Sequence, residues 1–198
     1  MNSTKTNSKT HLINTAYRLF LSKSYNSTST SLICDEASIN KGTFYHFFPS
    51  KAALLIACLE LHADILAGQM TEISGQDISA IEKIEKLKEI PREIAASSMS
   101  ESGKVEGCLL GNIALELSTI DDQIHTAITH CAYKVIKAIQ LTLEHYKTEN
   151  NIAMDTASAA EVMFSMMQGG ILLSKLENNP EKVVTVLKTL PEALKTYQ

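Results

Sequence analysis

Residues 28–51 constrain this chain most, because they hold two short helical patterns separated by a break. Leu32, Ile33 and Ala37 give the first pattern an apolar face, and the hydroxyl-rich residues 28–31 before it are typical of a helix N-terminus. Residues 38–40 interrupt the pattern, and a second short helix is expected to begin near Asn40. A turn of about three to four residues between two helices is the geometry that places the second helix in a DNA major groove. The segment therefore predicts a helix-turn-helix.

The rest of the chain also indicates helices. Aromatic residues make up 6% of its 198 residues, Trp is absent, and no long alternation typical of strands occurs. The predicted fold class is all-α with about nine helices. A three-helix domain that contains the helix-turn-helix is expected over residues 1–51, and a second helical domain over 52–198. Pro91 falls inside the fifth predicted helix and is expected to kink or split it.

Charge is distributed unevenly along the sequence. Residues 1–51 contain six Lys or Arg against Asp35 and Glu36, a balance of +4, so the remainder of a chain with net charge −4 carries −8. Local positive charge, rather than the total, attracts a protein to phosphates. The asymmetry favours a small basic DNA-binding domain attached to an acidic helical domain. We call residues 1–51 the reader and residues 52–198 the body.

The first 60 or so residues resemble the TetR family of bacterial transcription regulators. The resemblance is carried, without gaps, by residues 11–16 (HLINTA), Leu19-Phe20, Tyr25, Thr28-Ser29, residues 41–48 (KGTFYHFF) and Ser50-Lys51. Ser24 and Ser38 stand where the family usually has Gly, and Cys34 stands where Ala is usual. Ser38 is expected to need a strained turn conformation, because Gly adopts positive φ more readily than Ser.

The resemblance implies which residues of the reader contact double-stranded DNA. Thr28 combines a hydroxyl with nearby free amides, Lys41, Tyr45 and Lys51 offer donors to phosphates, and Gly42 lets the backbone approach the duplex. The full expected set is Thr28, Ser29, Lys41, Gly42, Thr43, Tyr45, His46 and Lys51, with Thr43 and His46 near the bases. The alternative is a helical hairpin with ordinary solvated polar side chains, which the gap-free pattern disfavours.

A nearly all-apolar helix over about residues 155–176 indicates a second surface. A helix without a polar face must be covered on several sides. Similar proteins pair their last two helices across a two-fold axis, which would set two readers on a pseudo-palindromic operator. The expected homodimer interface comprises Ala159, Met166, Gly169, Gly170 and Leu173. The alternative is a central helix of a monomeric core.

A small apolar effector is expected to bind in the body. Methionine side chains adapt to irregular apolar ligands. The candidate lining residues are Met99, Cys108, Asn112, Tyr133, Met163, Phe164 and Met167. The alternative for the methionines and aromatics is plain core packing.

Cys108 suggests a different switch. Cys108, Asn112 and Glu116 recur every four residues on one helix face, and a thiol in the first helical turn has a lowered pKa. The stretch also resembles a GCLLGN segment of one subgroup of these regulators, some of which sense reactive compounds through cysteine. The alternative is a packing cysteine. Since the four cysteines form no CxxC pair, neither zinc nor a disulfide framework is expected.

Other classes of protein fit less well. The acidic and His residues form no readable nucleophile–base pattern, so an enzyme is not expected, and no cofactor or metal is implied. A helical adaptor would not explain the basic reader. No run of 18 apolar residues and no signal-peptide core occur, which favours a cytoplasmic protein. The expected function is a transcription repressor released from its operator by an effector, with a Cys108 redox or electrophile switch as the alternative.

Overall fold

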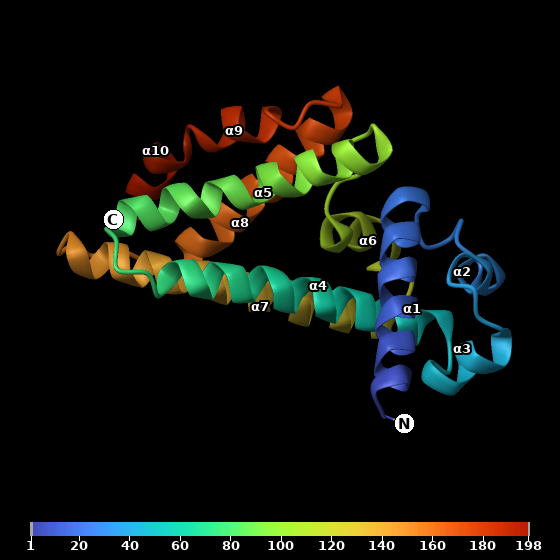
Figure 1. The fold of residues 1–198 in the computed structure, drawn as a ribbon. Coiled ribbons are helices and arrows are strands. Elements are labelled where there is room, and N and C mark those ends of the chain that lie inside the picture. Colours follow the sequence, from blue (N-terminus) through green and yellow to red (C-terminus); the bar gives the residue numbers. More distant parts are fainter. Residues whose placement is uncertain (1, 198) are drawn as a thin grey trace. The chain divides into compact units, whose positions relative to one another are not determined.

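The computed structural model describes residues 2–197, with side chains from Ser8 onward, and this part is helical without a strand (Figure 1). Its ten helices are α1 (Asn2–Lys23), α2 (Thr30–Glu36), α3 (Lys41–Phe47), α4 (Lys51–Ser74), α5 (Ala80–Ser102), α6 (Leu109–Leu117), α7 (Asp122–Glu149), α8 (Thr156–Glu177), α9 (Lys182–Leu187) and α10 (Leu190–Lys195). The all-α prediction is confirmed. The last expected helix is present as two short ones, α9 and α10, with Pro191 at the start of α10.

Local sequence explains where α5 begins and ends. Ser79 accepts the Glu82 backbone N–H while the Glu82 carboxylate accepts the Ser79 N–H, which is a complete capping box. Gly103 ends the helix in the left-handed conformation at φ 74°. Pro91 lies inside α5, which nevertheless continues as one helix, so the proline does not split it.

The chain forms two compact units. Unit 1 comprises Met1–His62 and Leu109–Cys131, and unit 2 comprises Ala63–Cys108 and Ala132–Gln198. The reader is therefore compact together with α6 and the first part of α7, whereas the sequence placed everything after residue 51 in the body. Long-range contacts of this kind leave no local sequence signal.

The core of unit 1 joins the first four helices. Leu12, Phe20, Ile33 and Phe44 are 0% exposed, and Leu54 on α4 is equally buried. Because burial of apolar side chains is the main favourable term in folding, these residues fix how α2 and α3 stand against α1. The short helices contribute few buried residues of their own, so the unit depends on α1 and α4.

By length and composition, helix α4 is long and apolar enough to cross a membrane. Among the described residues no other helix meets this criterion. Its side chains Leu54, Leu55, Cys58 and Leu59 are 0% exposed. Helices at the core of water-soluble proteins pass the same test. The burial of these four residues matches a core helix.

The core of unit 2 is centred on α8. Ala159, Ala160 and Met163 on α8 are fully buried, as are Leu87 on α5 and Val183 on α9. A Cβ built on Gly170 would lie 2.6 Å from Val183 Cγ2, so the absence of a side chain there lets α9 pack directly on α8. The Ser174 hydroxyl also accepts the Val183 backbone N–H at 3.0 Å. Helices α8 and α9 therefore form one tightly joined pair.

Candidate DNA-binding surface and effector cavity

Side-chain caps define both helices of the reader. Ser29 accepts the Leu32 backbone N–H at the start of α2, and Asn40 accepts the Thr43 N–H, 2.8 Å away, at the start of α3. Both residue types are preferred N-caps. Between the helices, Ser38 has φ 52°, so the predicted strained conformation at this turn is confirmed. The helix-turn-helix predicted from residues 28–51 is thus present.

Helix α3 has one buried and one exposed face. Phe44 is 0% exposed and Phe48, directly after the helix, is 4% exposed, so both are core residues as the sequence indicated. Lys41, Gly42, Tyr45 and His46 are exposed. These four form the outward face of α3, and we call them the α3 outer face.

Thr43, a further expected DNA contact, takes part in the N-cap of α3, and Gly42 lies close to that cap. Thr43 is half-buried, and its hydroxyl lies 3.2 Å from Asn40 Oδ1. A Cβ on Gly42 would lie 3.2 Å from the same oxygen, which is tighter than ordinary packing. Glycine at 42 therefore leaves room for the cap.

The structure corrects the roles expected for Thr28 and Lys51. The Thr28 side chain is 0% exposed, and its hydroxyl donates to the backbone oxygen of Ser24 at 2.7 Å. The Lys51 ammonium donates to the backbone oxygens of Tyr25 and Thr28, both at 2.9 Å. Burial lowers the pKa of Lys51 from its ordinary value. Both polar groups are thus occupied within unit 1 and hold the connection between α1 and α2, rather than facing outward to phosphates.

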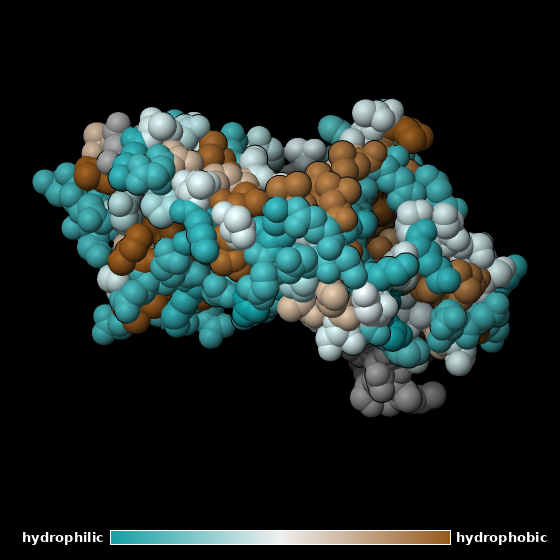
Figure 2. Space-filling model, turned by 90° about the horizontal axis from the view of Figure 1, so that it is seen from above, coloured by the Kyte–Doolittle hydropathy of each residue, from teal (hydrophilic) through white to brown (hydrophobic). Residues whose placement is uncertain are grey.

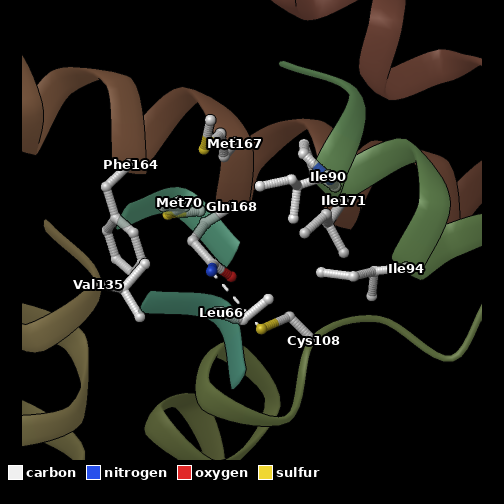
Figure 3. Close-up of a pocket in the computed structure, with 11 residues that line it drawn as sticks. Leu66, Met70, Ile90, Ile94, Cys108, Val135, Phe164, Met167, Gln168 and Ile171 are labelled. Carbon is white, nitrogen blue, oxygen red and sulfur yellow. Dashed lines mark hydrogen bonds between the residues drawn. The ribbon is translucent and has the colours of Figure 1, made fainter. Parts of the chain in front are cut away.

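A small apolar cavity of about 20 Å³ lies within unit 2 (Figure 3). Side chains from α4, α5, α7 and α8 and from the segment before α6 line it: Leu66, Met70, Ile90, Pro91, Ile94, Cys108, Val135, Phe164, Met167, Gln168 and Ile171. The polar groups of this lining belong to Gln168 and Cys108. Gln168 Nε2 lies 3.6 Å from Cys108 Sγ, as the dashed line in Figure 3 marks.

The cavity includes three of the residues expected to bind an effector, namely Cys108, Phe164 and Met167. Four others do not line it. Met163 is 0% exposed in the core, Tyr133 is 48% exposed, Met99 is half-buried, and Asn112 belongs to unit 1. Sequence reasoning missed the other eight lining residues, among them Leu66, Met70 and Gln168. The polar Gln168 within the apolar run of α8 was a usable signal for one of them.

The residues expected at a dimer interface also separate into two groups. Ala159 and Gly170 are buried within the chain, Gly170 against Val183 of α9. Met166 and Gly169 are half-buried, and Leu173 is 37% exposed. A Cβ built on Gly169 would meet no atom within 4 Å. The first two residues are therefore packing residues of the chain itself, and the last three remain accessible.

Metal sites and disulfides depend on how His, Cys, Asp and Glu residues are grouped in the described part of the chain. Over this part of the chain no group of three or more His, Cys, Asp or Glu residues is placed to hold a metal ion. None of the four cysteines forms a disulfide, and all four are buried. Burial raises the pKa of the Cys58 thiol to about 12.

An all-helical chain that presents a capped helix-turn-helix with a polar outer face belongs to the class of DNA-binding regulators. Comparison with known families agrees. The family model for bacterial regulatory proteins of the tetR family matches residues 12–58, and that for the C-terminal domain of LmrA/YxaF-like transcriptional regulators matches residues 84–189. The chain therefore belongs to the TetR family of transcriptional regulators.

Individual relatives cover nearly the whole chain. The transcriptional repressor DhaR of Mycobacterium sp. (strain GP1) is 27% identical over 93% of this chain and 90% of its own length. The repressor NemR of Escherichia coli (strain K12) is 22% identical over 98% of this chain and 96% of its own. A crystal structure of the reduced form of E. coli NemR aligns with a TM-score of 0.79 at 24% identity, covering 94% of this chain and 96% of that one. These similarities extend the shared fold from the reader through the body.

Proposed function

We propose that this regulator is a cytoplasmic repressor that binds a pseudo-palindromic DNA operator as a homodimer and leaves it when an effector occupies unit 2. The α3 outer face carries the proposal. It combines a cation at Lys41, a hydroxyl at Tyr45 and an imidazole at His46 on one short helix, backed by the buried Phe44. Charged and hydroxyl donors fix register on the phosphates, while side chains that reach base edges give specificity. We propose no enzymatic activity, because the relatives of this chain are transcriptional regulators.

Exposed apolar residues on α8 support the homodimer. Leu172, Leu173 and Leu176 are 48%, 37% and 72% exposed, and the open position Gly169 lies one turn before Leu172 and Leu173. On the face drawn in Figure 2, hydrophilic side chains predominate and hydrophobic ones emerge in separate areas. Single exposed apolar residues are ordinary, but several on one helix mark an interaction surface. A second copy of α8 is the occupant that we propose, because a two-fold axis makes such a surface self-complementary.

The cavity supports an apolar effector of small size. At about 20 Å³ it holds little more than one water molecule, so a larger ligand must displace side chains. Met70 and Met167 line it, and unbranched thioether side chains adapt to such displacement. A ligand shifts the regulator between two states only by its differential affinity for them. Moving a 1:99 equilibrium to 99:1 takes roughly 10⁴-fold preference.

Cys108 gives a specific reason to retain the thiol switch as a second candidate. Its side chain is 3% exposed, lines the cavity, and directly precedes α6. A small electrophile or oxidant that enters the cavity would therefore meet the sulfur beside the Gln168 amide. Cys108→Ser separates the candidates: if the variant still leaves DNA on treatment with an electrophile, the thiol switch is wrong.

An electrophoretic mobility shift assay with DNA flanking the regulator's own gene tests the proposal. A discrete complex that survives competitor DNA is expected, and its footprint should show two half-sites spaced by about one helical turn or a multiple of it. Measuring Kd at several salt concentrations gives the number of phosphates contacted. Absence of a specific complex on this DNA and on genomic fragments would contradict a DNA-binding repressor.

A further inference from the structure

The carboxylate of Glu116 binds the connection between α1 and α2. Its two oxygens accept the backbone N–H groups of Tyr25, at 3.1 Å, and of Asn26, at 2.8 Å. Glu116 lies on α6, about ninety residues further along the chain but in the same compact unit. Hydrogen bonds with an ionised partner are roughly twice as strong as neutral ones. A single side chain therefore satisfies two donors of a segment that precedes the reader helices.

Backbone carbonyl groups of the same connection also have hydrogen-bond partners. Lys51 donates to the carbonyl oxygens of Tyr25 and Thr28, and the Thr28 N–H donates to the Tyr25 oxygen at 3.1 Å. An acidic residue of α6 thus holds the N–H groups, and a basic residue of α4 holds the carbonyl groups. We call residues 25–28 the clasped segment.

A strained residue directly precedes the clasped segment. Ser24, directly before it, has φ 72°, in the left-handed region that favours glycine. Such conformations persist only where surrounding contacts determine them. Its other end is Thr28, which is followed by Ser29, the N-cap of α2. The hold on residues 25–28 therefore sets where α2 begins.

We propose that Glu116 is a positioning residue for DNA binding, which acts by holding the clasped segment in the conformation that the reader requires. It contacts no DNA itself, and the inference rests on the proposed function for its DNA arm. Removal of Glu116 has two opposing consequences. Loss of a negative charge from the reader's own unit strengthens attraction to a polyanion, whereas loss of the hold on residues 25–28 weakens specific binding. These opposite signs make the proposal testable.

The test compares wild type with Glu116→Ala and Glu116→Gln, and with Glu60→Gln as the matched control. Glu60 is an exposed carboxylate on α4 of the same unit, so its replacement changes the charge of unit 1 equally. We expect Kd for a specific operator fragment to rise at least tenfold in both Glu116 variants, with the salt slope unchanged, because no phosphate contact is lost. Glu60→Gln should bind as tightly as wild type or more tightly.

A second measurement does not depend on DNA. Amide hydrogen exchange of Tyr25 and Asn26 in the free protein should accelerate at least tenfold in Glu116→Ala, while the buried amides of α1 and α4 keep their protection. Ser24→Gly in the same background should recover part of the lost DNA affinity, because glycine adopts the native φ without strain. A role limited to overall stability would lower Tm without this local pattern.

The outcomes separate the two proposals. Unchanged exchange at Tyr25 and Asn26 overturns the positioning role, and so does Glu116→Ala binding operator DNA as tightly as wild type or tighter. If wild type forms no specific DNA complex, the proposed function fails. In that case faster exchange in Glu116→Ala still supports the hold on residues 25–28, and unchanged exchange still contradicts it.

Discussion

The Lys51 ammonium lies 3.9 Å from the centroid of the Tyr25 ring while it donates to the Tyr25 backbone oxygen, so one cation contacts one residue in two ways. Removing it leaves carbonyl groups of the clasped segment without their partner. Because hydrogen bonds to charged groups contribute about 1.5–3 kcal/mol, we expect Lys51→Ala to lower the free energy of unfolding by about 2 kcal/mol. Chemical denaturation measures it. A stability equal to wild type would show that solvent replaces these contacts at no cost.

Substitutions on the α3 outer face should weaken DNA binding and leave the stability of the protein nearly unchanged. Lys41 is exposed, so Lys41→Ala should leave the unfolding free energy within about 0.5 kcal/mol of wild type. It should weaken DNA binding for all sequences alike and reduce the salt slope by about one, as the loss of one phosphate contact does. Fluorescence anisotropy with specific and random duplexes measures both quantities.

His46 should differ from Lys41 in the same assay. If its imidazole reads a base edge, His46→Ala should cost about 1–3 kcal/mol on the specific duplex and little on random DNA. Equal losses on both duplexes would instead place His46 on the phosphate backbone. The two substitutions thus assign each side chain of the α3 outer face to positioning or to specificity.

The helix-turn-helix could be predicted from sequence because its signals are local. Ser29 and Asn40 cap helices within three residues of themselves, and Phe44 and Phe48 turn inward at helical spacing. Lys51 and Thr28 carry the same donor groups as true phosphate contacts, but their partners are backbone oxygens that only the fold brings near. Residue type predicted that these groups donate hydrogen bonds, but it did not predict which atoms accept them.

The body was less predictable for the same reason. Leu66 and Met70 line the cavity together with Cys108 and Phe164, although no sequence pattern links these helices. Gly170 fits a small-residue helix contact, but the partner is α9 of the same chain. Contacts between residues far apart in sequence decide such roles, and one sequence does not record them.

Ser38 offers a stabilising substitution. It has φ 52° at the turn between α2 and α3, where a residue with a Cβ is strained by about 1 kcal/mol or more. Ser38→Gly should raise the unfolding free energy by about 1 kcal/mol. Ser22→Gly, within α1, is the matched control and should lower it by about 0.5 kcal/mol, because glycine is a poorer helix former than serine. If both variants are destabilised, the strain at Ser38 is negligible.

The neighbouring glycines of α8 should behave differently. In Gly170→Ala the new Cβ would lie 2.6 Å from Val183 Cγ2 and 3.2 Å from its Cα, so α9 must shift, at a cost of about 1–3 kcal/mol. In Gly169→Ala the Cβ meets no atom of the chain within 4 Å, and the helix should gain about 0.5–1 kcal/mol. Thermal unfolding over a range of protein concentrations distinguishes this gain from any effect of Gly169→Ala on dimer formation. Equal effects of the two substitutions would contradict the packing of α9 on Gly170.

Thiol labelling should discriminate among the buried cysteines. The pKa of Cys58 is raised to about 12 by burial, so its thiolate, the reactive form, is almost absent near pH 7. Burial raises the pKa of Cys34 as well. If the thiol switch operates, iodoacetamide should modify Cys108 first in the folded protein, and Cys108→Ser should remove that labelling and the electrophile response together. Peptide mass spectrometry identifies the site. Modification of all four cysteines at one rate would indicate reaction through global unfolding, and an unreactive Cys108 would leave the apolar effector as the sole candidate.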